Sequence, residues 1–221
     1  MKFYLDLSKI QTFMNFNLFL SKIHQLKNAK LGGLDAQFRL APKMRLRYSS
    51  EKIKANQPKK AAVLALFYPN KENETCFLLT LRASYNGTHS AQISFPGGKI
   101  ENTDKNLEAT ALRETFEEVG IHHNDITILR EITDVYIPPS NFLATPFIGY
   151  TNQKPTLKTN DEVAETIEIL LHDLLDDNSI TTINITTSYA DNLEVPCFKL
   201  NDYIVWGATA MMLNEIKELL K

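Results

Sequence analysis

The sequence predicts one mixed domain of the α/β (α+β) class with an N-terminal extension, and two observations lead to this. Short apolar runs rich in β-branched residues recur along the chain between turn-forming residues. Two other segments repeat their apolar residues every three or four positions, as a helix does. Because strands and helices are interleaved without an internal repeat, we expect a sheet packed against helices. The length of 221 residues suffices for a sizeable core.

The predicted strands are short and end at turn-forming residues. In chain order they are AAVLALFY (61–68), CFLLTLR (76–82), AQISFPGG (91–98), ITILREITDVYI (126–137), TPFIGYT (145–151) and SITTINITTSYA (179–190). The segment 161–177 combines features of a strand and a helix, and both remain open. The loop YIPPSNF (136–142) either lines a pocket or only makes a turn. The chain closes with a helix over 205–221, with Trp206 expected in the core at its start.

The N-terminal residues 1–58 are predicted to form a helical extension and a basic connector. One helical face carries Phe13, Phe16, Leu20 and Ile23. Residues 43–60 contain seven Lys and Arg residues against one Glu. Two interpretations stay open for this stretch: a solvated linker, or a basic arm that helps to hold a phosphorylated ligand.

Composition and charge exclude several classes of protein. The formal net charge of -2 gives no general attraction to nucleic acid or to an anionic membrane. Cys76 and Cys197 both stand in apolar surroundings, which argues against a disulfide framework and fits a reducing compartment. Polar residues interrupt the apolar-rich N-terminus, so we predict no signal peptide or membrane span and expect a cytoplasmic location.

The most informative stretch is FPGGKIENTDKNLEATALRETFEEVG, residues 95–120. Its helical part is predicted to bury one face, formed by Ala109, Leu112, Phe116 and Val119. Glu114, Glu117 and Glu118 then lie on the opposite side within an arc of roughly 100°. These like charges repel, and Mg²⁺ or Mn²⁺, which favour oxygen ligands, would offset the repulsion. A solvated acidic face is the alternative.

Two further features accompany the glutamates. Gly97-Gly98 is expected to form a turn that aims a backbone carbonyl at a cation and lets a ligand approach closely. Arg113 adjoins the acidic arc and is placed to orient a carboxylate.

The stretch RETFEEVGI (113–121) resembles the second half of the Nudix box, the signature of the Nudix hydrolases, with Thr115 where an aliphatic residue is usual. In the first half, Gly98 is followed six positions later by Asp104 instead of Glu, and one extra residue precedes Arg113. The same longer spacer with an Asp occurs in the Nudix branch that hydrolyses coenzyme A. The chain is therefore similar to that branch.

More of the chain, from about Ala61 to Lys221, shares this resemblance. The matching motifs are LLTLR (78–82), HSAQISFPGG (89–98), TALRE (110–114) and WGATA (206–210). Gly87 stands where the branch usually has Arg, and Ala91 where it usually has Gly. Both positions belong to the motif associated with coenzyme A and not to the chemistry.

The resemblance implies an α/β/α sandwich with a mixed β-sheet over residues 59–221, after an extension over 1–58. It implies metal-dependent hydrolysis of a pyrophosphate bond, with Mg²⁺ or Mn²⁺ as cofactor. The expected substrate is coenzyme A or acyl-CoA, giving 4'-phosphopantetheine or its acyl form and adenosine 3',5'-bisphosphate.

The resemblance also assigns roles to residues of this chain. The implied metal ligands are Glu114, Glu117, Glu118 and the carbonyl of Gly98. Glu114 is the general base in some members and a later loop supplies it in others, here with Glu162 and Glu165 as candidates. Arg113 belongs to the catalytic set. The expected substrate-binding residues are Arg82, His89 and Phe95, and a structural role stays open for His89.

Two other functions remain open. One keeps the chemistry and changes the substrate to ADP-ribose, a dinucleotide or a nucleoside triphosphate. The other is a Nudix-fold ligand sensor without catalysis, which the retained glutamates disfavour. We expect a small-molecule nucleotide as partner, no nucleic acid or membrane, and a possible homodimer.

Overall fold

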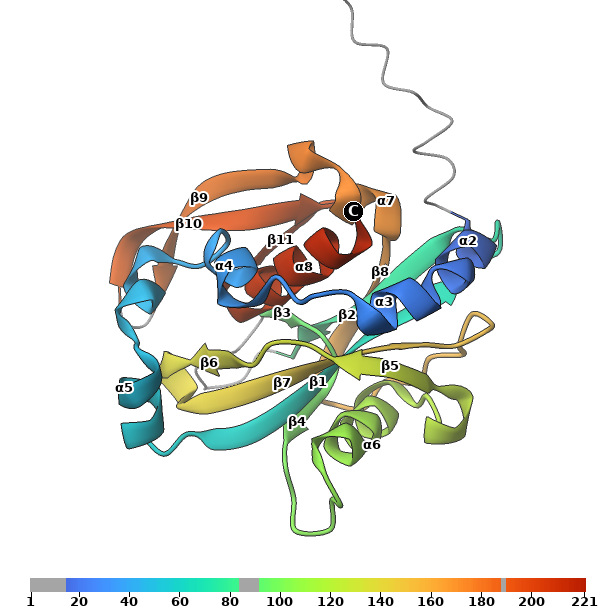
Figure 1. The fold of residues 1–221 in the computed structure, drawn as a ribbon, viewed down its shortest axis with the longest axis horizontal. Coiled ribbons are helices and arrows are strands. Elements are labelled where there is room, and N and C mark those ends of the chain that lie inside the picture. The colour runs from blue at the N-terminus through green and yellow to red at the C-terminus, as the bar shows by residue number, and fades with distance from the viewer. Residues whose placement is uncertain (1–14, 84–91, 188–189) are drawn as a thin grey trace, which may run out of the picture.

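The computed structural model describes residues 15–83, 92–187 and 190–221 (Figure 1). Its helices are α2 (Phe16–Ser21), α3 (Ile23–Asn28), α4 (Gly33–Phe38), η1 (Lys43–Arg47), α5 (Ser50–Ala55), α6 (Leu107–Val119), η2 (His123–Asp125), η3 (Pro138–Ser140), α7 (Leu171–Leu175), η4 (Asp177–Ser179) and α8 (Gly207–Leu220). Its strands are β1 (Lys59–Pro69), β2 (Thr75–Arg82), β3 (Ile93–Ser94), β4 (Gly97–Lys99), β5 (Thr127–Glu131), β6 (Val135–Ile137), β7 (Phe142–Tyr150), β8 (Val163–Leu170), β9 (Ile180–Thr187), β10 (Ala190–Leu200) and β11 (Tyr203–Trp206). None of these described helices is both long and apolar enough to cross a membrane.

Strand β1 is the centre of the main sheet. It pairs antiparallel with β2, where Phe67 faces Phe77, and parallel with β7, where Ala61 faces Ala144. The strand order is β3-β2-β1-β7-β5, while β4 pairs with β1, β6 with β7 and β8 with β2. Since parallel and antiparallel pairs share one sheet, the predicted mixed sheet is confirmed. A second, antiparallel sheet has the order β11-β10-β9.

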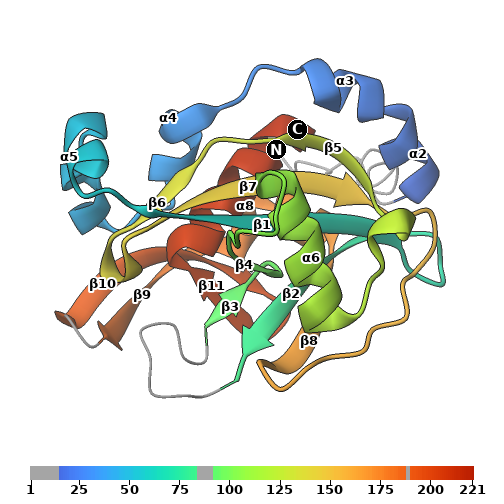
Figure 2. The same ribbon diagram turned by 90° about the horizontal axis from the view of Figure 1, so that it is seen from below.

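Alternate side chains of β1 enter two different cores. Leu64 and Leu66 pack in one cluster with apolar residues of α6. Ala65 and Phe67 pack in the other cluster, which also contains residues of α2, α3 and α8. The two-residue period of a strand explains this division. Figures 1 and 2 accordingly show α6 on one side of the sheet and α8 with the N-terminal helices on the other, which confirms the α/β/α sandwich.

Several predicted elements are divided in the structure. Residues 126–137 form β5 and β6 instead of one strand. Residues 91–98 were expected to end in a Gly-Gly turn, but Gly97 and Gly98 lie inside β4 and pair with β1. Pro96, which has no backbone N–H, separates β3 from β4. The undecided segment 161–177 is a strand, β8, followed by the short helix α7.

The N-terminal segment is packed onto the domain. The predicted helix is broken at Lys22 into α2 and α3, and Phe16 and Leu26 are buried while Leu20 and Ile23 are half-buried. Phe13 lies outside the described residues. Residues 43–60 are folded into η1, α5 and the start of β1, although the α5 side chains are largely exposed. This stretch is therefore not a free linker.

The predicted core face of α6 is confirmed at Val119 and Leu112, which pack in the core, and is wrong at Phe116. Ala111, Thr115 and Val119 are fully buried, whereas Phe116 is 50% exposed. Glu118, expected on the solvent side, is only 3% exposed and accepts a hydrogen bond from the backbone N–H of Gly97 at 3.0 Å. The face of α6 that packs against the sheet thus carries a carboxylate as well as apolar side chains.

Candidate active site

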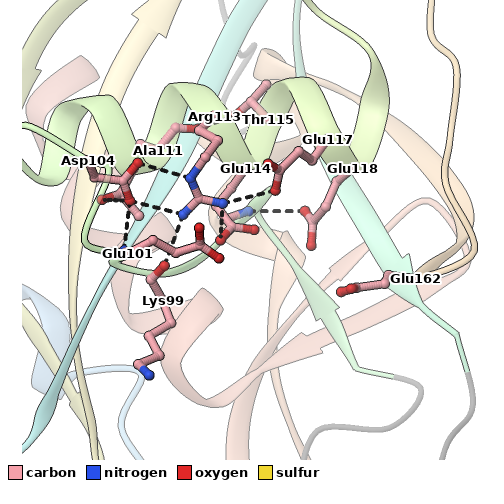
Figure 3. Close-up of polar contacts among 12 residues, drawn as sticks. Lys99, Glu101, Asp104, Ala111, Arg113, Glu114, Thr115, Glu117, Glu118 and Glu162 are labelled. Carbon is pink, nitrogen blue, oxygen red and sulfur yellow. Dashed lines mark hydrogen bonds and ion pairs between the residues drawn. The ribbon is translucent and has the colours of Figure 1, made fainter.

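Arg113 is the centre of a polar network at the N-terminal half of α6 (Figure 3). Its guanidinium makes two hydrogen bonds to Asp104, at 2.9 and 3.0 Å. It also donates to Glu114 at 3.0 Å, to Glu117 at 2.9 Å and to the carbonyl of Lys99 at 3.0 Å. These five contacts match the five N–H donors of an arginine side chain. Arg113 therefore holds two of the three glutamates in fixed positions.

The two glycines of β4 allow the glutamates to approach the strand. A Cβ atom on Gly98 would lie 2.5 Å from the carboxyl carbon of Glu114. A Cβ atom on Gly97, whose φ is 154°, would lie 2.3 Å from the carbonyl oxygen of Ala62. Glycine is needed at both positions, at Gly98 for the carboxylate of Glu114 and at Gly97 for the pairing with β1.

Burial changes the protonation of this cluster. It raises the pKa of Glu118 to about 7, against the opposing effects of the Gly97 N–H and Arg82. Burial also raises the pKa of Glu114 above its usual value, although Arg113 acts in the opposite direction. Hydrogen bonds from Arg113 lower the pKa of Asp104 to about 2. Asp104 is thus an anion at neutral pH and neutralises Arg113, while the pKa of Glu118 lies near neutral pH.

Arg82 connects the cluster to Glu162, the residue before β8. It forms ion pairs with Glu118 at 3.5 Å and with Glu162 at 3.3 Å. Figure 3 shows Glu162 across from Glu118, apart from the Arg113 network. Arg82 therefore brings a cation and a fourth carboxylate to the same place.

A pocket of about 450 Å³ joins these groups. One wall carries Arg82, Glu114, Glu117, Glu118 and Glu162. The rest of the lining includes apolar and small residues of β1, β6, β7, β11 and the start of α8. The pocket can thus hold a ligand with an anionic centre and a long, partly apolar body.

The predicted site residues do not all meet in this pocket. Gly98, Arg113 and the three box glutamates line it together with Glu162 and Arg82. Glu165 is not among the lining residues, and it accepts a hydrogen bond from the Tyr203 hydroxyl at 2.5 Å instead. Phe95 contributes to the wall but is 2% exposed, with its ring 6.4 Å from that of Phe77. His89, Gly87 and Ala91 lie outside the described residues.

The pocket also contains residues whose roles the sequence left open or placed elsewhere. Ile137, Pro139 and Ser140 line it, so the loop 136–142 does more than make a turn. Trp206, expected in the core, is half-buried and stands on the wall. Arg45 of η1 lines the pocket as well, and the basic character of residues 43–60 was the signal for it.

The donor set fits a hard divalent cation. Carboxylates and backbone carbonyls are the oxygen ligands that Mg²⁺ and Mn²⁺ prefer. In the described part of the chain, no three acidic, histidine or cysteine side chains already converge as a complete metal site. The carboxylates of Glu114 and Glu117 are turned toward Arg113, which keeps both beside the pocket.

Comparison with known proteins identifies the family to which this α/β/α domain with an acidic pocket belongs. A model of the NUDIX domain matches residues 58–183. The uncharacterised Nudix hydrolase NudL of Photorhabdus laumondii is 30% identical over 142 residues, which are 64% of this chain and 75% of the relative. NudL of Yersinia pestis is 31% identical over 146 residues, which are 66% and 72% of the two chains.

A solved structure agrees on the fold. The MutT/nudix family protein from Enterococcus faecalis aligns with a TM-score of 0.50 at 16% identity, covering 97% of this chain and 73% of that one. The chain belongs to the Nudix family and is a Nudix pyrophosphohydrolase.

Proposed function

We propose that this chain hydrolyses the pyrophosphate bond of coenzyme A or an acyl-CoA, giving 4'-phosphopantetheine or its acyl form and adenosine 3',5'-bisphosphate. The observation that carries the proposal is the position of WGATA (206–210). This segment resembles the coenzyme A branch, and its first four residues line the same pocket as the box glutamates. Thr209 also donates to the carbonyl of Ile93 at 2.9 Å, which ties the segment to the strand before the glycines.

The ligands for Mg²⁺ or Mn²⁺ in this proposal are Glu114, Glu117, Glu118 and the carbonyl of Gly98. When bound, the cation neutralises phosphate charge and acidifies a bound water. Arg113 keeps Glu114 and Glu117 at the pocket, and its pairing with Asp104 keeps the guanidinium from turning away. Arg82 offers a positive charge beside the phosphates.

Glu162 accepts the proton of the attacking water in this mechanism. Of the two candidates in the segment, Glu162 lines the pocket and Glu165 does not. The water oxygen forms a bond to one phosphorus while the bond from that phosphorus to the bridging oxygen breaks. The bridging oxygen leaves with the other phosphate, and the proton of the water passes to Glu162.

The first experiment separates the substrates. The purified protein is incubated with coenzyme A, ADP-ribose or a diadenosine polyphosphate, with Mg²⁺, Mn²⁺ or EDTA, and the products are resolved by HPLC. Release of adenosine 3',5'-bisphosphate from coenzyme A that EDTA abolishes is the expected result. Cleavage of another substrate with coenzyme A intact would replace the proposed substrate, and no cleavage at all would favour a sensor.

Matched variants test the roles of the glutamates. Glu117→Gln is expected to lower kcat by roughly 100-fold or more, while Glu108→Gln on the same helix, outside this pocket, keeps the activity. Glu162→Gln is likewise expected to lose roughly 100-fold in kcat, and Glu165→Gln to keep it. Equal losses for Glu162→Gln and Glu165→Gln would contradict the choice of Glu162.

A homodimer and a cytoplasmic location stay predictions.

A further inference from the structure

Arg45 reaches the pocket from outside the part of the chain that matches the NUDIX domain, residues 58–183. Its guanidinium donates a hydrogen bond of 2.7 Å to the carbonyl of Tyr136 and lies 3.3 Å from the sulfur of Met211. These contacts come from β6 and α8, two elements far apart in the sequence. The side chain of Arg45 is therefore held at the pocket wall before any ligand binds.

The segment that carries Arg45 is fixed on β6 by further contacts. The rings of Tyr48 and Tyr136 meet edge to face, with centroids 5.3 Å apart. Asn56 donates to the Tyr136 hydroxyl at 2.9 Å, and that hydroxyl donates to Asn141 at 3.0 Å. A cation held in this way loses little conformational entropy when it binds an anion.

Ser140 provides a second polar group at the same end of the pocket. Its hydroxyl oxygen is buried and has no hydrogen-bond partner among the described residues, although the residue lines the pocket. A buried hydroxyl without a partner is unfavourable, and an acceptor on a ligand would remove that cost. Ser140 ends η3, which directly follows β6, the strand that holds Arg45.

This end of the pocket lies away from Arg82. Arg82 ends β2, Tyr136 is in β6, and β1 and β7 run between them. Three strand spacings separate the two positions, which is roughly 14 Å. Ala61, Phe142 and Ala144 line the pocket on the intervening strands. A ligand that reaches both ends must carry two anionic groups on either side of a less polar middle.

We propose that Arg45 and Ser140 form a subsite for a second phosphate, a phosphomonoester on the nucleoside part of the substrate. The inference rests on the proposed function, in which that group is the 3'-phosphate of coenzyme A. Arg45 and Ser140 then decide specificity and take no part in the cleavage itself. The guanidinium supplies charge-assisted hydrogen bonds, and the Ser140 hydroxyl donates to a phosphate oxygen.

The kinetic test compares coenzyme A with dephospho-coenzyme A, which lacks only this phosphate. Arg45→Gln is expected to lower kcat/KM for coenzyme A by roughly 10- to 100-fold and to leave dephospho-coenzyme A within about twofold. Ser140→Ala is expected to act in the same direction with a smaller loss, and Arg45→Lys to restore part of the preference. Arg47→Gln, which removes a neighbouring exposed charge of η1, is the control. It is expected to keep the wild-type ratio of kcat/KM between the two substrates. Equal losses on both substrates would overturn the subsite.

A binding measurement separates the failure of the subsite from the failure of the proposed function. Adenosine 3',5'-bisphosphate and AMP are titrated by calorimetry into the wild type, Arg45→Gln and Arg47→Gln, and circular dichroism checks their folding. A preference for the bisphosphate in the wild type and in Arg47→Gln, lost in Arg45→Gln, supports the subsite even if coenzyme A is not cleaved. Equal binding of the two nucleotides by the wild type, or no binding of either, would overturn it.

Discussion

The buried carboxylate of Glu118 accepts a hydrogen bond from the backbone N–H of Gly97 at 3.0 Å, and this contact ties α6 to β4. It places an acid in an interior position that an apolar side chain would ordinarily occupy. Phe116, on the same helix, is 50% exposed. The face that α6 presents to the sheet therefore includes a carboxylate and leaves a large apolar side chain outside.

Glu118 makes the stability of the metal-free protein depend on pH. Burial raises its folded pKa to about 7, above the ordinary value of 4.5. Between these values the folded state binds more protons than the unfolded state, so the free energy of unfolding falls as pH rises. We expect the free energy of unfolding of the wild type, relative to that of Glu118→Gln, to fall by about 2 kcal/mol from pH 5 to pH 7.5.

Urea unfolding in EDTA at both pH values measures this change. Glu108→Gln is the control, because it alters an exposed acid on the same helix. A constant difference between wild type and Glu118→Gln would show that the Glu118 proton is held equally in both states.

Alanine substitutions at the two glycines of β4 are expected to have different effects, mainly on activity at Gly98 and mainly on stability at Gly97. In Gly98→Ala the new methyl group meets the end of the Glu114 side chain, which can move aside. We expect a loss of stability below about 1 kcal/mol and a fall in kcat of roughly 100-fold. In Gly97→Ala the methyl group meets backbone atoms of Ala62 and Val63, so we expect a loss of roughly 2 to 4 kcal/mol.

Parallel urea unfolding and turnover measurements on the two variants check this contrast. An active, folded Gly98→Ala protein would show that the position of Glu114 against the strand is not needed for turnover.

Asp104 is expected to stabilise the loop before α6 through Arg113. Because its folded pKa of about 2 lies below the ordinary 3.8, its contribution is fully present above pH 3.8 and is lost as pH falls toward 2. Asp104→Asn should lower the free energy of unfolding at pH 7 by roughly 1.5 to 3 kcal/mol. The difference in the free energy of unfolding between wild type and Asp104→Asn should close as pH falls from about 4 to about 2.

Chemical unfolding across this range tests the prediction, with the exposed Asp125→Asn as the control. Activity should fall as well, because Glu114 and Glu117 are held through Arg113. If the free energies of unfolding of wild type and Asp104→Asn still differ by the same amount at pH 2, the loss of stability comes from packing and not from the Asp104 charge.

Glu215 is expected to hold the N-terminal extension on the domain. This fully buried carboxylate accepts hydrogen bonds from Gly33 N–H at 2.9 Å, Gln37 at 2.9 Å and Thr133 at 2.6 Å. Glu215→Ala leaves these donors unpaired, so we expect a loss of roughly 3 kcal/mol. We propose that residues 1–58 then detach before the domain over 59–221 unfolds.

Limited proteolysis followed by mass spectrometry checks the order of these events. Glu218→Ala, also on α8, removes a more exposed pair with Arg39 and should cost less than about 1 kcal/mol. Cleavage spread evenly over both parts of Glu215→Ala would argue against a separate extension.

The sequence by itself determined β1, β2, β7 and β9, the two long helices and the chemistry of residues 95–120. Apolar periodicity is a local property, so β1, β2 and α8 could be predicted from neighbouring residues alone. The spacing of Arg113 and the three glutamates is also local, because less than two turns of a helix carry all four. The Nudix resemblance rests on this same short stretch, and the family comparison confirmed it.

Only the tertiary structure decided which residues share the pocket. Glu162 and Glu165 are equal candidates in the sequence, yet Glu162, just before β8, meets Arg82, and Glu165, in β8, meets Tyr203. Arg45 stands more than fifty residues before the glycines and lines the same pocket only because η1 folds onto β6. The burial of Glu118 beside the Gly97 N–H likewise joins two separate segments. Each of these outcomes follows from contacts between segments that are distant in the sequence. The energies of such contacts cannot be predicted from the pattern of neighbouring residues.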